Sequence, residues 1–298
     1  MRRALALDIG GTKLAAGVVN EAGEVLRSSV APTSAGDAES LFESLLAVIS
    51  EVQQGEEVVC GVGCGGPMTF GPEGGELVSP LNIPAWTDFP LRRRLSSALG
   101  VPVFIDNDAK ALALGEGWAG AARGVDDYIA MVVSTGVGGG IVSGGRLLDG
   151  AAGNAGHIGH VIVEPVVGRM CVCGARGCLE AEASGPSIAA VTGRPPAEAG
   201  PEIVARTGTL VGRAVASVAN LLDLRLAVVA GSVALGFGEP FFAAAQAELD
   251  RSTRLAFSRG ARIVPAALGA GGGLVGAAKV GFDGLARSGR APASESPG

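Results

Sequence analysis

The hydrophobic pattern opens with three short apolar runs separated by turn residues. Ala4–Leu7 and Leu14–Val19 flank Gly10 and Gly11, and Glu24–Val30 follows a second turn. Short apolar runs bounded by glycine-containing turns are typical of β-strands. We therefore predict that the chain begins with three antiparallel strands.

The same criteria predict most of the later elements. Helical spacing of apolar residues, or an apolar run of strand length, defines each of them. The predicted helices are Asp37–Gln53, Pro90–Leu99, Ala109–Trp118 and Glu202–Leu222, and the predicted strands are Glu57–Val62, Val101–Ile105 and Leu226–Ala230.

The opening pattern recurs later in the chain. Ile129–Val133 and Ile141–Val142 flank a turn over Ser134–Gly140. Two hairpins with glycines in their turns, about 125 residues apart, indicate a duplicated fold with one hairpin in each domain. We predict an N-terminal α/β domain over residues 1–108 and a larger C-terminal α/β domain over 109–286. The last helix, near 274–286, can pack back on the first domain, and residues 287–298 are predicted to form a disordered tail.

Composition narrows the class of protein. Of 298 residues, 48% are hydrophobic and 17% are charged, which predicts a globular chain. The net charge of −6 argues against nucleic acid as a partner. The 18 residues of Tyr128–Gly145 carry no charge, but their six glycines predict two strands and a turn rather than a membrane span. With no signal peptide visible, we expect a cytoplasmic location and no membrane partner.

Both glycine turns have the composition of a phosphate-binding site. Glycine lets the backbone approach a bulky anion and direct successive N–H groups toward it. Glycines that only reverse the chain are the alternative at each hairpin, and Lys13 can equally be a solvated strand-edge residue. Asp8 can be a turn residue or can help to hold Mg²⁺ beside the phosphates. The candidate nucleotide-binding residues are Asp8, Gly10, Gly11, Thr12, Lys13, Thr135, Gly136, Gly138, Gly139 and Gly231.

Other phosphate motifs fit poorly. The chain has no G-x-x-x-x-G-K-[ST] sequence, which excludes a P-loop. Gly61–Gly66 matches G-x-G-x-x-G after a predicted strand, but Pro67 follows and no helix begins there. Gly271–Gly276 matches too, without an acidic residue at the distance that a ribose contact requires.

An acidic group marks the junction between a predicted strand and a predicted helix. Asp106, Asn107 and Asp108 lie there, the position at which open α/β sheets present their site residues. Phosphoryl transfer to a hydroxyl needs a carboxylate that orients the hydroxyl and accepts its proton. Asp108 is our candidate for this base, and the alternative is that Asp108 only caps the following helix.

Cysteine and histidine residues form a second cluster. Three of the five cysteines fall within Cys171–Cys178, and both histidines lie just before them, at positions 157 and 160. An odd cysteine count with this clustering favours a metal site in a reducing compartment over a disulfide framework. His160, Cys171, Cys173 and Cys178 supply the ligands of a closed structural zinc site, whose loop would present His157 and Glu180 to a ligand.

Together these residues resemble the ROK family of sugar kinases and regulators. The resemblance rests on Asp8–Lys13, Pro80–Asn82, Asn107–Ala109, Ser134–Gly140, Gly156–His160 and Cys171–Glu180. It implies an actin-like/hexokinase-like (ribonuclease H-like) two-domain fold with ATP and Mg²⁺ in an interdomain cleft. It also implies phosphorylation of a hexose at its 6-hydroxyl, with Asp108 as the base, and a homodimer or homotetramer. The residues that it places around the sugar are Gly66, Asn82, Asn107, Asp108, His157, His160 and Glu180.

Two departures from the family pattern bear on specificity. His157 stands where family members commonly have Glu, which resembles N-acetylmannosamine kinases, whereas the Pro80–Trp86 loop resembles glucokinases. Ala270–Gly273 lacks the acidic residue that the family often carries there. An ATP-dependent, glucokinase-like hexose kinase is the leading hypothesis. An N-acetylmannosamine kinase, a sugar-sensing transcription regulator and a non-catalytic sugar-binding protein are the alternatives.

Overall fold

The chain forms two compact units in the computed structural model, which describes residues 1–33, 36–71 and 74–289. The first unit comprises Met1–Ala111 and the chain from Ala270 onwards, and the second comprises Leu112–Gly269. The division falls within helix α3 (Asp108–Ala119), the helix that also contains the predicted domain limit after residue 108.

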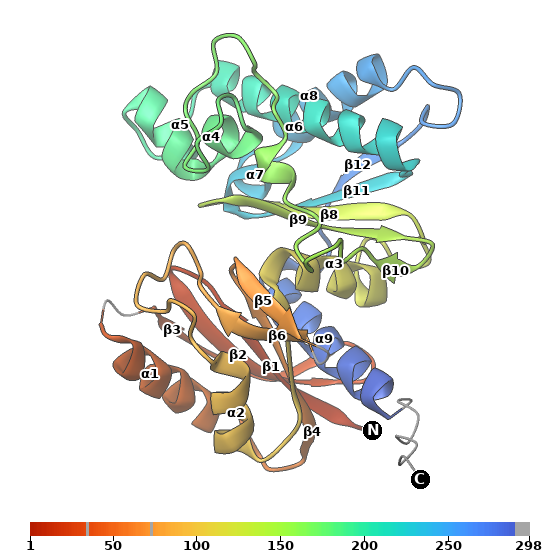
Figure 1. The fold of residues 1–298 in the computed structure, drawn as a ribbon. Helices are drawn as coiled ribbons and strands as arrows, with labels where there is room; N and C mark the ends of the chain where they lie inside the picture. Colours follow the sequence, from red (N-terminus) through yellow and green to blue (C-terminus); the bar gives the residue numbers. More distant parts are fainter. Residues whose placement is uncertain (34–35, 72–73, 290–298) are drawn as a thin grey trace. The chain divides into compact units, whose positions relative to one another are not determined.

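The first unit is built on a five-stranded sheet with the order β3-β2-β1-β4-β7 (Figure 1). Strands β1, β2 and β3 are antiparallel neighbours, which confirms the predicted start of the chain, and β1, β4 and β7 are parallel. The strands are β1 (Arg3–Ile9), β2 (Lys13–Asn20), β3 (Val25–Pro32), β4 (Glu57–Cys64) and β7 (Val103–Asn107).

The second unit repeats this arrangement. Its sheet has the order β10-β9-β8-β11-β12, with an antiparallel β8–β9 hairpin and parallel β8, β11 and β12. The uncharged run therefore forms a hairpin, and the predicted duplication is confirmed. The strands are β8 (Tyr128–Val133), β9 (Val137–Ser143), β10 (Arg146–Leu147), β11 (Leu226–Ala230) and β12 (Arg262–Pro265).

Strand β1 alternates large and small apolar residues, so the two faces of the first sheet differ. Leu5, Leu7 and Ile9 pack in one core cluster with residues of α1 (Ala38–Ser50) and α2 (Leu91–Leu99). Because successive side chains point to opposite faces of a strand, the alanines between them lie on the other face. This other face is covered by α9 (Gly272–Ser288) (Figure 1).

Glycines allow α9 to approach the small-residue face closely. A Cβ at Gly61 would overlap the carbonyl oxygen of Ala277, and a Cβ at Gly284 would overlap the ring of Phe104. Gly281 in turn lies against the backbone of Gly61. The high glycine content therefore serves helix-on-sheet packing as well as turns.

The second sheet is covered in the same two-sided manner. Ile129, Met131 and Val133 join the core cluster that includes α6 and α8, whereas Ala130 packs with Ala113 of α3. The hydroxyl of Tyr128 donates to the carbonyl of Ala113 at 2.8 Å. The remaining helices of this unit are α4 (Leu179–Ala183), α5 (Gly185–Thr192), α6 (Pro201–Leu222), α7 (Ser232–Phe237) and α8 (Glu239–Ser252), with 3₁₀ turns at Ile158–His160, Pro196–Glu198 and Gly269–Gly271.

Two features differ from the sequence prediction. A small hairpin, β5 (Met68–Gly71) and β6 (Gly74–Val78), was not predicted. The last helix, which was expected to be able to pack back on the first domain, lies in the first unit and continues to Ser288. The tail predicted from residue 287 therefore begins too early, and its residues 290–298 lie outside the described chain. Within the described residues, the helices lack the combination of length and apolar character needed to cross a membrane.

Replacing Gly61 by alanine tests the close approach of α9. We expect Gly61→Ala to lower the free energy of unfolding by about 3 kcal/mol, the upper part of the usual cost of overpacking, because the added methyl meets backbone rather than a movable side chain. Urea denaturation of the unliganded protein measures this. Gly236→Ala, at an exposed helical position with open space around it, is the matched control and should be neutral or stabilising by up to about 1 kcal/mol. Equal stabilities of the two variants would contradict the packing argument.

Candidate active site

The first glycine turn connects β1 to β2 and is fixed by several hydrogen bonds. The N–H of Gly10 donates to the carbonyl of Lys13 at 3.0 Å, and the Thr33 hydroxyl donates to the carbonyl of Gly10 at 2.7 Å. Neither turn glycine has a positive φ. Gly11 is required for a different reason, because a Cβ there would overlap Asn82.

Asp8 ends β1 beside this turn. Lys13 Nζ lies 3.6 Å from Asp8 Oδ2. Burial raises the pKa of the Asp8 carboxyl above its usual value, and the charge of Lys13 opposes that rise. A Cβ at Gly273 would overlap the Asp8 carboxylate, so the first turn of α9 lies against it. This contact gives a physical reason for glycine, rather than an acidic residue, at position 273.

Asp108 is the first residue of α3, directly after β7. Burial raises the pKa of its carboxyl to about 6, and the negative charge of Asp8 adds to the rise. One hydrogen bond, from the N–H of Ala109 to Oδ1 at 2.8 Å, acts in the opposite direction. The carboxyl group is therefore half-ionised near pH 6, which is much closer to neutral pH than for an ordinary aspartate and suits a general base.

Asn107, rather than Asp108, makes the capping contacts of this helix. Its Oδ1 accepts from the N–H of Ala109 at 3.0 Å and from the N–H of Lys110 at 3.4 Å. A side-chain acceptor that reaches the second and third residues ahead is the usual N-cap geometry. These contacts therefore identify Asn107 as the cap of α3, in place of Asp108.

A buried ion pair stabilises the junction between β7 and α3. The ammonium of Lys110, whose side chain is 2% exposed, lies 3.1 Å from Asp106 Oδ1. The same oxygen accepts from the N–H of Asn107 at 2.8 Å. Lys110 also lies 5.2 Å from the centre of the Phe70 ring in β5. The pair therefore connects the end of β7, the start of α3 and the β5–β6 hairpin.

The other predicted sugar residues of the first unit gather at the same edge. Gly66 follows β4, and a Cβ at Gly66 would lie 3.4 Å from Asn107 Nδ2. The carbonyl of Gly66 accepts from the N–H of Leu81 at 3.2 Å, next to Asn82. The carboxyl ends of β1, β4 and β7 thus bring Gly11, Gly66, Asn82, Asn107 and Asp108 together.

The second glycine turn is shorter than predicted. It comprises Ser134, Thr135 and Gly136, with the N–H of Ser134 donating to the carbonyl of Gly136 at 2.9 Å. Gly138 and Gly139 belong to β9, where they pair with Val132 and Met131 of β8. The prediction of a turn that extends to Gly140 is therefore wrong. Close approach of the backbone at Gly156 accounts for the glycine at 139.

Strand β11 brings a further segment to this turn. Gly231 follows the strand with φ of 101°, and a Cβ there would overlap the carbonyl of Val133. The hydroxyls of Ser134 and Ser232 are hydrogen bonded at 2.8 Å. The predicted residues Thr135, Gly136 and Gly231 thus lie around one corner of the second sheet.

A pocket of about 810 Å³ opens beside this corner, entirely within the second unit. Sequence reasoning did not find it, because its walls come from four separate segments, although the Pro195–Pro196 break was a visible signal. Its lining is mainly apolar, with hydroxyls and one guanidinium: Ser134, Thr135, Gly185, Pro186, Ala189, Gly193, Arg194, Pro195, Pro196, Ala197, Ser232, Val233, Gly236 and Phe237.

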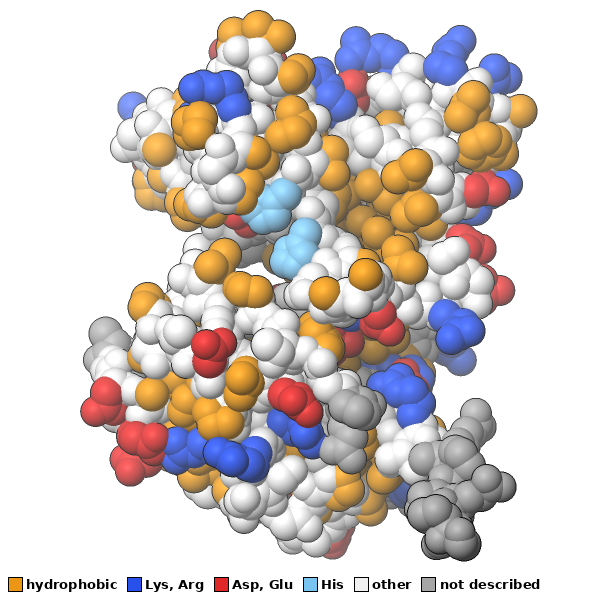
Figure 2. Space-filling model, in the orientation of Figure 1, with side chains coloured by type: hydrophobic (Ala, Val, Ile, Leu, Met, Phe, Trp, Pro, Cys, Tyr) orange, Lys and Arg blue, Asp and Glu red, His pale blue; other side chains and the backbone are white. Residues whose placement is uncertain are grey.

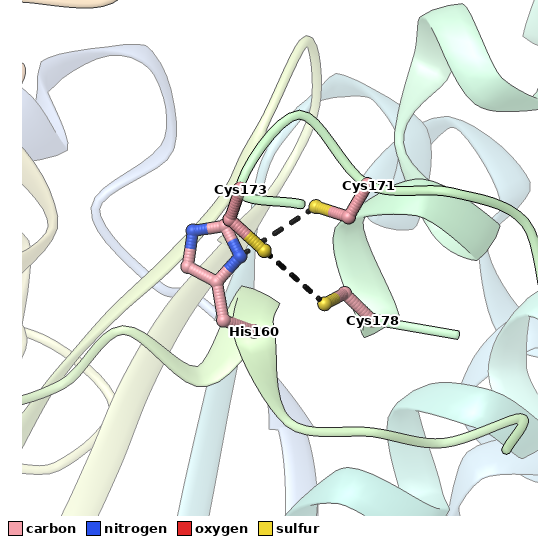
Figure 3. A group of neighbouring side chains, drawn as sticks. All are labelled: His160, Cys171, Cys173 and Cys178. Carbon is pink, nitrogen blue, oxygen red and sulfur yellow. Dashed lines mark hydrogen bonds between the residues drawn. The ribbon is translucent and has the colours of Figure 1, made fainter. Parts of the chain in front are cut away.

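The four predicted metal ligands converge, as Figure 3 shows. Their ligand atoms all lie within 4.8 Å of one another. Cys171 Sγ is 3.7 Å from His160 Nδ1, and Cys173 Sγ is 3.6 Å from Cys178 Sγ. Tetrahedral bonds of ~2.3 Å to one ion would place neighbouring sulfurs ~3.8 Å apart, whereas a disulfide needs ~2.0 Å. The donors fit a metal ion and not a disulfide.

His157 and Glu180 lie close to this cluster along the chain. His157 is exposed and His160 is partly buried, and both histidine side chains reach the surface (pale blue in Figure 2). Their ring centres are 6.1 Å apart. Glu180 lies on α4, just after Cys178, and its Oε2 accepts from the N–H of Val137 at 2.8 Å. The Glu180 carboxylate therefore contacts the second glycine turn, which the sequence did not indicate.

Known proteins share both the sequence and the fold. Over 185 residues the chain is 42% identical to the glucokinase of Thermotoga maritima, covering 62% of this chain and 58% of that protein. Over 251 residues it is 36% identical to the N-acetylmannosamine kinase of Escherichia fergusonii, covering 78% and 84%. The match therefore spans less than two thirds of the glucokinase.

A solved structure extends the similarity over nearly the whole chain. The ROK family glucokinase of Streptomyces griseus, in complex with glucose and AMPPNP, superposes with a TM-score of 0.81 at 30% identity, covering 94% of this chain and 99% of that one. This confirms the predicted actin-like/hexokinase-like fold. The ROK family model matches residues 4–281, and the chain therefore belongs to the ROK family.

Proposed function

We propose that this protein transfers the γ-phosphoryl group of ATP to the 6-hydroxyl of a hexose, with glucose as the leading substrate. The observation that carries the proposal is Asp108, a carboxylate at the carboxyl end of β7 whose pKa is raised to about 6. Glucokinases and kinases of N-acetylmannosamine among the relatives, and the complex with glucose and AMPPNP, support this reaction class.

In the proposed mechanism Asp108 accepts the proton of the attacking hydroxyl. Positioning and electrostatic stabilisation account for most of the catalysis of phosphoryl transfer, so the base must hold the hydroxyl in line with the phosphorus. The Asn107 cap and the Asp106–Lys110 pair fix the backbone on either side of the carboxylate. Burial keeps the carboxylate basic enough to accept a proton at neutral pH.

The nucleotide is proposed to bind to both glycine turns. The 810 Å³ pocket beside Ser134 and Thr135 has the size and apolar lining of a small-molecule site and can take the nucleoside. The backbone N–H groups of the two turns would face phosphate oxygens. Asp8 offers the hard oxygen that Mg²⁺ prefers, and Lys13 lies beside it as a second charge for the phosphates.

The sugar is proposed to contact Gly66, Asn82 and Asn107 together with the zinc-loop residues His157, His160 and Glu180. His160 directs Nδ1 toward the cysteines, which leaves Nε2 as the nitrogen for a hydroxyl. The N-acetylmannosamine kinase among the relatives is matched over 84% of its length. The family resemblance also implies that His157 stands where members commonly have Glu. N-acetylmannosamine is therefore the second candidate substrate.

The cysteine–histidine cluster is proposed to hold a structural Zn²⁺. Four protein ligands leave no open position, so the ion would stabilise the loop rather than polarise a substrate. Burial raises the pKa of the Cys178 thiol to about 12, and an ion is what would allow such a thiol to become a thiolate. All five cysteines are free, which supports the expected cytoplasmic location. The homodimer or homotetramer stays a prediction from the family resemblance.

Asp108→Asn tests the assignment of the base. We expect kcat to fall by about 10²-fold or more, because the amide cannot accept the proton. A coupled assay of ADP release with glucose, N-acetylmannosamine, N-acetylglucosamine, allose and fructose measures the loss and identifies the sugar. The variant should be at least as stable as the wild type at neutral pH, since it no longer buries a charge. Asp250→Asn, at an exposed position on α8, is the control. Full activity of Asp108→Asn would refute the assignment.

The pH profile tests the raised pKa of Asp108. Only the ionised carboxylate acts as a base, so kcat/KM should be halved near pH 6 and fall tenfold for each further pH unit below it. A carboxyl with an ordinary pKa, near 3.8, would leave the rate constant down to about pH 5. Initial rates between pH 4.5 and 8, with stability checked at each pH, distinguish the two profiles. A flat profile down to pH 5 would contradict the pKa shift.

Metal analysis tests the zinc proposal. The purified protein should contain about one zinc per chain, and Cys173→Ser should lose most of it. Removal of the metal should lower the melting temperature by about 5–10 °C, since metal binding contributes to folding. Cys60→Ala removes a thiol from the core of the first unit, outside the cluster, and should keep the metal. Active protein without zinc would argue against a structural ion.

A further inference from the structure

The second glycine turn is held from outside by one short segment of chain. Its first residue, Ser134, accepts at its carbonyl from the N–H of Gly185 at 2.7 Å. The residue after the turn, Val137, donates its N–H to Glu180 Oε2 at 2.8 Å. Glu180 belongs to α4, and Gly185 is the first residue of α5, which follows α4 after the single residue Ser184. The two flanks of the turn are thus tied to two consecutive short helices.

Glu180 makes the one of these two contacts that involves a side chain. A Cβ at Gly136 would lie 3.0 Å from Glu180 Oε2, so the carboxylate lies directly on the backbone of the turn. A carboxylate that accepts from a backbone N–H forms a charge-assisted hydrogen bond, which is stronger than one between neutral groups. The contact therefore constrains the orientation of the peptide units between Ser134 and Val137.

The position of Glu180 is unfavourable for a phosphate ligand by charge alone. A carboxylate beside a phosphate-binding turn repels the phosphates and also engages an N–H that could face them. Its contribution to nucleotide binding must therefore be conformational: it holds the turn in the shape that presents the remaining N–H groups. The helix that carries it is well anchored, because Leu179 is fully buried and its N–H donates to the carbonyl of Val161 at 2.9 Å.

We infer that Glu180 is a positioning residue for the nucleotide, acting through the hydrogen bond from Val137, in addition to its proposed contact with the sugar. The inference rests on the proposed function, because it takes the second glycine turn as a phosphate site. It implies that nucleotide affinity depends on Glu180 even when no sugar is present. A residue that contacts only the sugar would have no such effect.

Three substitutions of Glu180 distinguish its effect on the conformation of the glycine turn from the effect of its negative charge. Glu180→Gln keeps an acceptor oxygen at the same reach and removes the charge. Glu180→Asp keeps the charge but is one methylene too short to reach the N–H of Val137, and Glu180→Ala removes both. Isothermal titration with AMPPNP and Mg²⁺, without sugar, measures the dissociation constant of each protein. Glu202→Ala, an exposed position in the first turn of α6, is the control for net charge.

We expect the Asp and Ala variants to bind AMPPNP about tenfold more weakly, equivalent to about 1.4 kcal/mol, and the Gln variant to stay within twofold of the wild type. Tighter binding by both Gln and Ala would mean that repulsion dominates and would overturn the inference. Equal binding by all variants would do the same. If Glu180→Ala does not fold, the comparison of Asp with Gln decides alone.

The wild-type measurement distinguishes a failure of the proposed kinase function from a failure of the positioning role of Glu180. If the wild type itself fails to bind AMPPNP, the proposed kinase function fails, whatever the variants do. If the wild type binds and the Asp variant binds equally well, only the positioning role fails. Melting temperatures of the variants show whether a loss of affinity reflects the turn or a general loss of stability.

Discussion

The close contact between helix α9 and the first sheet is the constraint on which the candidate site in that unit depends. It exists because positions on both sides, including Gly61 and Gly281, carry no side chain. The same approach brings the first turn of the helix against Asp8, where only a glycine at position 273 fits. The partial positive charge of a helix N-terminus favours a nearby carboxylate, which offsets part of the cost of burying Asp8.

Electrostatic coupling then extends from Asp8 to the candidate base. The charge of Asp8 raises the pKa of Asp108, in addition to the larger effect of burial. Any cation that binds beside Asp8 would weaken this repulsion and lower the pKa of Asp108. In the proposed reaction, a cation bound beside Asp8 would therefore increase the ionised fraction of Asp108. Lys13, 3.6 Å from Asp8, already provides part of this compensation.

The sequence was sufficient where one local pattern determines the structure. The hairpins follow from apolar runs around glycines, and the position of Asp108 follows from a strand that ends in polar residues. Contacts between residues far apart in the chain could not be predicted from the sequence. The glycines of β9 looked like turn residues, although backbone approach at Gly156 explains Gly139. The pocket is assembled from four segments that no periodicity connects. The Glu180–Val137 bond joins residues 43 positions apart.

The position of α4 gives a structural role to the cluster of His160, Cys171, Cys173 and Cys178. Five residues are too few for a helix that is stable by itself, so α4 needs anchors at its ends. Cys178 directly precedes the helix and belongs to the cluster. Gly185, the first residue of α5, lies two residues beyond the end of α4, and its N–H donates to the carbonyl of Ser134. A fixed α4 places Glu180 where its Oε2 accepts from the N–H of Val137, beside the second glycine turn. An anchored α4 therefore holds Glu180 against the second glycine turn. A flexible loop could do this only at a cost in conformational entropy.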